Sequence, residues 1–411
     1  KNDGKVRLIR ENILQNQPVL DVEVSNYGEV GLLGITSSDS TVYLFFQEAF
    51  HDGGLMLESR IYSYTWNGQK LIEPKLVKTL PGWPEGGAAH YSGVFTTDLS
   101  KNVYFVIGNQ YKFGTLQNYL PSESFNCNIK AVVCDSSQNV SFSDSIEYTI
   151  SCINVSFHHY TTNPFSYQTQ QPDLSDNPWE TNLSFILQNI QSCFKGFIYN
   201  NFSNGNWKDT SVILKIVPND DDYYAIGVRN SFGLTVDPLT GNLWMTDNGN
   251  DKYDEINLVL EKSNLGATKY VGPVNKESVA TVPGYEEYVY KNPEFSWELP
   301  VGVTSLEFVD SNMFKKYKNW LFVADSHNGN IYKFKLNSDR TGFVFNSPHL
   351  EDNIVNILSK PAGITEDTDF TRIDYSTFLV EPMDEILFGK NFGIISDITF
   401  GPDGSLYVIS F

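Results

Sequence analysis

The chain has 411 residues, enough for one large repeat fold or for two to three ordinary domains. Acidic residues outnumber basic ones by 49 to 29, while aromatic residues make up 14% and charged residues 19% of the chain. This composition argues against disorder, and the net charge of −20 argues against a nucleic-acid partner. No run of 18 apolar residues is present, so the sequence predicts no transmembrane segment.

Five stretches along the chain share one strand pattern. In each, a strand with alternating apolar residues is followed by a turn and then by a second strand that carries an aromatic residue. Asp, Pro and Gly recur in the turns, as hairpins require. We expect hairpins at residues 32–46, 91–109, 232–249, 304–326 and 395–411, with the aromatic residues Tyr43, Tyr104, Trp244, Trp320 and Tyr407.

Five copies of one hairpin in an all-β chain predict a radial repeat rather than a sandwich. We expect a six-bladed β-propeller formed by residues 1–411, with about 68 residues in each blade. The first residues, KNDGKVRLIREN, and the last strand, SLYVISF, read together as one strand–turn–strand unit. We therefore expect both termini to close the ring. In the alternative, the terminal strand pairs with a neighbouring molecule and the protein self-assembles.

Residues 110–222 have the features of an exposed insertion. A helix pattern lies within them at residues 176–196. They contain all four cysteines, which allow three disulfide pairings: Cys127, Cys134, Cys152 and Cys193. They also contain every N-x-S/T sequon, beginning at Asn139, Asn154, Asn182 and Asn201. We therefore expect a disulfide-bonded, glycosylated insertion and an extracellular or cell-surface location.

Several motifs of the chain resemble the glucose/sorbosone dehydrogenase family, which contains the soluble quinoprotein glucose dehydrogenases. The resemblance covers nearly the whole chain apart from the insertion. It implies a six-bladed propeller that oxidises a sugar with pyrroloquinoline quinone and calcium. The motifs are YGEVGLLGI (27–35), HYSG through VIGN (90–109), GVRNSFGL (227–234), DNGNDKYDEINLV (247–259) and ISDITFGPDGSLYV (395–408).

The resemblance assigns site residues to these motifs. It makes His90 the base that takes a proton from a sugar hydroxyl, and it places Asn109 where the family has the carboxylate that orients this histidine. Arg229 is placed at a catalytic and cofactor-binding position. The further cofactor-binding positions are those of Glu29, where the family has a glutamine, and of Asn230, Asn248 and His327.

Three basic positions of the implied cofactor clamp are replaced in this chain. His327 stands in place of a lysine, and Ile394 and Ser396 stand in place of two arginines. A charged hydrogen bond is worth roughly 1.5 to 3 kcal/mol, so three would contribute roughly 4 to 9 kcal/mol, or roughly 10³- to 10⁶-fold in affinity. We therefore expect quinone turnover to be weak or absent.

The implied calcium position is the turn that contains Gly249 and Asn250, followed by Asp254. In this turn the resemblance places the metal on backbone carbonyl oxygens, which calcium accepts readily. Asn250 replaces the usual proline. Arg229, Asp254 and Glu255 can also have a purely structural role, since all three side chains are able to bond backbone groups in the turns.

Two functions of different classes follow from these residues. The first is a secreted dehydrogenase that oxidises a sugar or another alcohol. The second is a non-catalytic propeller that binds a glycan or a cell-surface protein, or that serves as a structural component of a surface. Dye reduction with added quinone, calcium and an aldose would distinguish the two.

Overall fold

The computed structural model describes residues 3–11, 13–82, 89–112, 114–118, 208–216, 223–275, 287–360 and 378–411. The four cysteines, the four sequons and the helix pattern at 176–196 lie outside the described residues, so the predicted disulfides and glycans stay predictions. Within the described part, no helix is long and apolar enough to cross a membrane.

The described part is built from β-sheets, with only short 3-10 turns between them. The first large sheet has the order β5(Leu32–Ser38), β6(Thr41–Ala49), β7(Met56–Trp66) and β8(Leu71–Leu80). The second has the order β17(Val289–Tyr290), β16(Ser263–Asn264), β12(Tyr223–Ile226), β11(Val212–Lys215), β10(Val103–Ile107) and β9(Val94–Thr97). The third has the order β13(Gly233–Val236), β14(Leu243–Asp247), β15(Asp254–Val259), β18(Phe295–Trp297) and β22(Ile354–Val355). The fourth has the order β19(Val303–Phe308), β20(Leu321–Asp325), β21(Ile331–Phe334) and β25(Leu387–Gly389).

Smaller elements complete the described fold. A two-stranded sheet pairs β26(Ile395–Phe400) with β27(Leu406–Ser410). Three short pairs join β1(Lys5–Val6) to β4(Leu20–Asp21), β2(Ile9–Arg10) to β3(Ile13–Leu14), and β23(Ile357–Ser359) to β24(Leu379–Val380). The 3-10 turns are η1(Thr115–Gln117), η2(Asn312–Tyr317) and η3(Pro348–Leu350).

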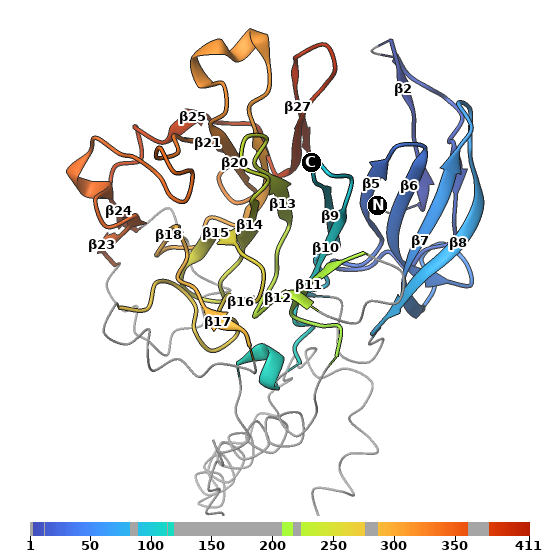
Figure 1. Ribbon diagram of the computed structural model, residues 1–411, viewed down its shortest axis with the longest axis horizontal. Helices are drawn as coiled ribbons and strands as arrows, with labels where there is room; N and C mark the ends of the chain where they lie inside the picture. The colour runs from blue at the N-terminus through green and yellow to red at the C-terminus, as the bar shows by residue number, and fades with distance from the viewer. Residues whose placement is uncertain are drawn as a thin grey trace, which may run out of the picture.

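All five predicted hairpins are confirmed. They are the antiparallel pairs β5–β6, β9–β10, β13–β14, β19–β20 and β26–β27. The first strands of successive hairpins contact one another in the order β5, β9, β13, β19 and β26. Figure 1 shows the resulting fan, with the β5–β8 sheet on one flank, β21 and β25 on the other, and β9–β10 and β13–β14 between them. This is the radial arrangement of a propeller.

The hydrophobic core lies between successive sheets. In β10, Phe105 packs toward the first sheet and Val106 toward the third, because neighbouring side chains of a strand point to opposite faces. Trp244 and Trp297 are completely buried between the third and fourth sheets. Ile398 packs the β26–β27 hairpin against the fourth sheet. Each sheet therefore buries its apolar side chains against the next one around the fan.

The chain organisation departs from the prediction at one boundary. The predicted insertion was bounded at residue 222, but β11 at Val212–Lys215 pairs with β10 and β12 and is a regular strand of the second sheet. That boundary was wrong, because the buried run Val212 to Leu214 belongs to the propeller core. The expected pairing of the termini is not among the pairings of the described strands, where β27 pairs with β26 and β1 with β4. Six blades and closure by the termini stay predictions.

Candidate functional site

Four turns from the second and third sheets meet at one place, and we call them the turn cluster: residues 89–92, 108–111, 227–231 and 248–250. Backbone bonds join them, since Asn109 N donates to Arg229 O at 2.9 Å and Asn248 N donates to Asn230 O at 3.1 Å. Ser231 N donates to the Ser92 hydroxyl at 2.9 Å. Three of the five motifs that carry the resemblance, at 90–109, 227–234 and 247–259, therefore converge on one structure.

Several residues of the turn cluster have a left-handed backbone. The φ angles are 61° at His90, 54° at Ser92, 48° at Gln110 and 55° at Tyr111. A residue other than glycine adopts this conformation only at a cost in free energy, and such residues concentrate at functional sites. Gln110 N donates to His90 O at 3.2 Å, so the strained turns hold each other in place. This concentration favours a functional role for the cluster.

The His90 ring is held in one tautomer. Its Nδ1 lies 2.7 Å from Asn109 Oδ1. That oxygen also accepts from Tyr111 N at 3.0 Å, while Asn109 Nδ2 donates to Thr268 Oγ1 at 2.6 Å. Because a backbone N–H can only donate, the Asn109 atom facing it is the oxygen, and His90 Nδ1 must carry the hydrogen. The lone pair of the neutral ring is therefore on Nε2.

The environment of His90 keeps the ring neutral. The residue is 5% exposed, and the Tyr111 ring lies over it with the ring centres 4.2 Å apart. Burial lowers the pKa of His90 to about 3, the positive charge of Arg229 contributes to this lowering, and the Asn109 bond only partly offsets both. A neutral imidazole with its Nε2 lone pair available can accept a proton or a hydrogen bond from a hydroxyl.

Glu29 brings a carboxylate to the same place from the segment before β5. It accepts from the His90 backbone N and from Asn230 Nδ2 at 3.2 Å, and so connects residues of three sheets. Asn230 is 5% exposed, and its Oδ1 has no partner among the described residues. Since Glu29 orients the Asn230 amide, that oxygen is an unused hydrogen-bond acceptor in the cluster.

Arg229 is bound to the neighbouring turn. Its Nη1 donates to Asn248 O at 2.7 Å and to Gly249 O at 2.8 Å, and its Nη2 donates to Asn250 Oδ1 at 3.2 Å. Asp247 accepts from the backbone N–H groups of Arg229 at 2.8 Å and of Asn230 at 2.6 Å. Burial raises the pKa of Asp247 to about 6, and these donors oppose that effect.

The acidic residues of the predicted calcium turn are engaged in backbone bonds. Asp254 accepts from Gly249 N at 3.0 Å, Val301 N at 2.8 Å and Gly302 N at 2.6 Å. Glu255 accepts from Gly272 N, and burial raises the pKa of Glu255 to about 8. Within the described ranges, no group of three or more His, Cys, Asp or Glu side chains could hold a metal ion. These contacts support the structural reading of Asp254 and Glu255.

The remaining predicted cofactor positions do not supply a cationic clamp. His327 is exposed, with its Nδ1 3.4 Å from Pro300 O. Ile394 is 55% exposed, and the Ser396 hydroxyl donates to Ile409 O at 3.3 Å. Asn248 Nδ2 donates to two backbone carbonyls, those of residues 230 and 303. With Arg229 bound to the turn and Glu29 adding negative charge, these residues do not fit a tricarboxylate.

The structure adds two residues that the sequence did not single out. Thr268 fixes the Asn109 amide from 159 positions away along the chain, and Tyr111 covers the His90 ring. No local motif marks Thr268. Tyr111 follows Asn109 by two positions, so an aromatic residue that recurs at this spacing in related sequences would be the signal for it.

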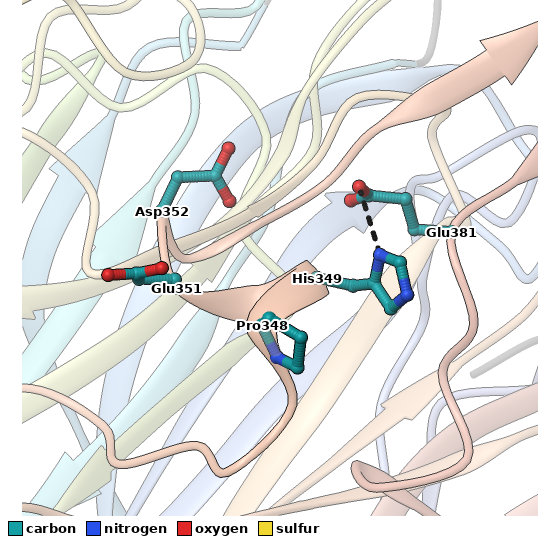
Figure 2. Close-up of a pocket in the computed structure, with 5 residues that line it drawn as sticks. All are labelled: Pro348, His349, Glu351, Asp352 and Glu381. Carbon is teal, nitrogen blue, oxygen red and sulfur yellow. Dashed lines mark ion pairs between the residues drawn. The ribbon is translucent and has the colours of Figure 1, made fainter.

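A surface pocket lies elsewhere on the molecule. Figure 2 shows the pocket around η3, with His349 and Glu381 facing each other. His349 Nδ1 and Glu381 Oε1 are 3.9 Å apart, and Glu351 and Asp352 also line the pocket. The histidine side chain is 54% exposed, so this ion pair contributes little to stability. The pocket contains no residue of the turn cluster and is not the candidate site.

Comparisons with known proteins show which proteins this chain is similar to. Residues 204–358 match the family model described as Glucose / Sorbosone dehydrogenase. The chain is 23% identical over 121 residues to the aldose sugar dehydrogenase YliI of Escherichia coli (strain K12), a match that covers 29% of this chain and 33% of that protein. The chain thus matches about a third of the length of this curated relative.

Solved structures share the fold of this chain. A glucose dehydrogenase-type oxidoreductase of Thermus thermophilus has a TM-score of 0.52 at 19% identity, over 100% of this chain and 85% of that one. The PQQ-bound aldose sugar dehydrogenase of Streptomyces coelicolor has a TM-score of 0.50 at 14% identity, over 99% and 82%. The family-model match over residues 204–358 and the shared fold make this chain similar to the glucose/sorbosone dehydrogenase family over that segment.

Proposed function

We propose that this protein binds a neutral sugar or glycan at the turn cluster and that it does not oxidise sugars with pyrroloquinoline quinone. The observation that carries the proposal is the fixed neutral tautomer of His90 beside the Glu29 carboxylate. His90 Nε2 is an acceptor, and the hydroxyl groups of a sugar are the donors that such an acceptor selects.

The charge of the turn cluster supports a neutral ligand over an anionic one. Glu29, Asp247 and Asp254 contribute three carboxyl groups, whereas Arg229 is the one guanidinium in contact with these turns in the described part of the chain. An added anion would meet repulsion here, since like charges at short range interact strongly in a poorly solvated site. A neutral, hydroxyl-bearing ligand avoids this repulsion.

One observation favours the second candidate, an active sugar dehydrogenase. His90 is neutral and oriented, and a base in that state can take the proton from a sugar hydroxyl when an acceptor for the hydride is supplied. The aldose sugar dehydrogenase of Streptomyces coelicolor was solved in a PQQ-bound form. The orienting group here is the Asn109 amide, which holds the ring but cannot neutralise an imidazolium by charge. In the serine-protease triad the corresponding Asp-to-Asn change lowers turnover by about 10⁴.

The test measures binding and turnover on the same samples. Saturation-transfer NMR with a panel of neutral aldoses and oligosaccharides should detect binding in the unmodified protein and its loss in His90→Ala. Dye reduction with added quinone, calcium and the same sugars should stay at the background rate. Sugar-dependent dye reduction that His90→Ala abolishes would instead establish the dehydrogenase.

We further propose an extracellular or cell-surface location for this binding function. The cysteines and N-x-S/T sequons, which lie outside the described residues, support it, because disulfides and N-linked glycans form in secreted proteins. Non-reducing electrophoresis and glycosidase treatment of the natural protein would test this location directly. If no sugar binds, the result would indicate that the cluster binds a protein partner instead of a glycan.

A further inference from the structure

The turn at residues 248–250 already contains a cation. The Arg229 guanidinium lies against three oxygens of this turn, at 2.7 Å from Asn248 O, 2.8 Å from Gly249 O and 3.2 Å from Asn250 Oδ1. Arg229 is 8% exposed, so these contacts form largely out of water. Both hydrogens of Nη1 are used on backbone carbonyls, which makes the turn a guanidinium-binding site within the chain.

The same oxygens are of the kind that calcium binds. Calcium takes carbonyl and amide oxygens at about 2.3–2.6 Å, so an ion on Gly249 O would lie in the space that Nη1 occupies. Two cations at that separation would repel each other strongly, because the site is shielded from solvent. The carbonyl of Gly249 therefore serves either the guanidinium or a metal ion.

The side chains around the turn fit the guanidinium. Asn250 Nδ2 donates to Asp251 at 2.8 Å, which turns Oδ1 toward Arg229, and a proline at this position would offer no such acceptor. Asp254, the nearest predicted metal ligand, is buried and accepts from the backbone N–H of Gly249, Val301 and Gly302. Releasing it to a metal ion would leave these buried donors without a partner.

We propose that Arg229 is the resident cation of the 248–250 turn, in place of a divalent metal ion. The conformation of the turn is then independent of calcium in the unmodified protein. Removing the guanidinium leaves an arrangement of carbonyl and amide oxygens without a cation, and this vacated turn is the one place in the cluster that should acquire affinity for calcium. The inference stands whether or not the cluster binds a sugar.

The experiment compares three proteins after dialysis against EDTA: the unmodified chain, Arg229→Ala, and the control Arg10→Ala, which removes an exposed arginine of β2 that donates to the Gly68 carbonyl. Thermal unfolding is followed with EDTA, with calcium chloride, and with sodium chloride at equal ionic strength. We expect the unmodified chain and Arg10→Ala to respond equally to calcium and sodium. Arg229→Ala should melt at a lower temperature, recover part of the loss with calcium, and bind calcium at least about tenfold more tightly than the unmodified chain.

A second measurement tests the proposal even if the Arg229→Ala variant does not fold. Amide NMR of the unmodified protein monitors Gly249 and Asn250 while calcium is added, with Arg229→Lys as a variant that keeps a positive charge. No saturable shift of these two amides in either protein supports the proposal. A saturable calcium-dependent shift of Gly249 and Asn250 in the unmodified protein, or equal calcium affinity in Arg229→Ala, would overturn it.

Discussion

Replacing His90 by glutamine should change how the stability of the protein depends on pH. The pKa of His90 is about 3 in the folded protein, against an ordinary value of 6.5. Below pH 6.5 the unfolded chain binds a proton that the folded chain does not, so the free energy of unfolding falls as the pH drops from 6.5 toward 3. The whole difference corresponds to about 5 kcal/mol.

Between pH 7 and pH 5 the expected part of this loss is about 2 kcal/mol. The glutamine in His90→Gln does not titrate. Unfolding in guanidinium chloride should therefore show that the free energy of unfolding of this variant falls by about 2 kcal/mol less than that of the unmodified protein over the same pH interval. The comparison of the two proteins cancels the contributions of other titrating groups, provided that they do not couple to residue 90. An identical pH dependence in both proteins would refute the reasoning.

A second variant tests whether a negative charge at residue 109 offsets the burial that lowers the pKa of His90. Asn109→Asp places a carboxylate on His90 Nδ1, at the 2.7 Å contact that the amide now makes. An opposite charge at this distance should raise the pKa of His90 by about 1–3. The His90 ring resonance, assigned by its absence in His90→Gln, reports this value in an NMR titration. A resonance that titrates near 6.5 in the unmodified protein would show that the ring is not buried as described.

Three further predictions concern buried groups of the third and fourth sheets. Burial and the nearby Asp247 charge raise the pKa of Glu255 to about 8, so the free energy of unfolding falls as the pH rises toward 8. Glu255→Gln has no carboxyl group to titrate, so in denaturant unfolding it should lose about 3 kcal/mol less than the unmodified protein between pH 5 and 8. Arg340→Ala leaves the fully buried Asp237 carboxylate without its cation and should cost about 3–5 kcal/mol, part of which Asp237→Asn should restore in the same background. Trp297→Ala should cost about 3–5 kcal/mol in thermal unfolding, and Trp297→Phe should cost less because the indole Nε1 has no partner to lose in the described structure.

The repeating hairpins could be predicted from the sequence because their signals are local. In each hairpin the alternating apolar residues and the turn residues lie within one short stretch of the chain, and all five predicted hairpins formed. The boundary at residue 222 failed for the opposite reason. The run at Val212–Lys215 pairs with β10 across the long segment that separates them, and no local pattern records that pairing.

The contacts among the candidate site residues could be predicted only in part. His90 and Asn109 do meet, as the resemblance implied. The contact between Glu29 and Asn230 spans 201 positions, and its partners are set by how the sheets pack around the fan. Arg229 was expected to face a cofactor, yet its donors are used on the neighbouring turn. Residue identities give the available donors and acceptors, and only the tertiary fold decides which of them pair.

Equilibrium binding of pyrroloquinoline quinone, followed by tryptophan fluorescence with calcium present, tests the central claim most directly. The claim is that the turn cluster retains an oriented neutral histidine without the positive charges that a tricarboxylate needs. We predict no saturable binding at micromolar quinone for the unmodified protein, and a gain in affinity when His327→Lys, Ile394→Arg and Ser396→Arg are combined. Saturable micromolar binding by the unmodified protein, with sugar-dependent dye reduction that His90→Ala abolishes, would contradict the account.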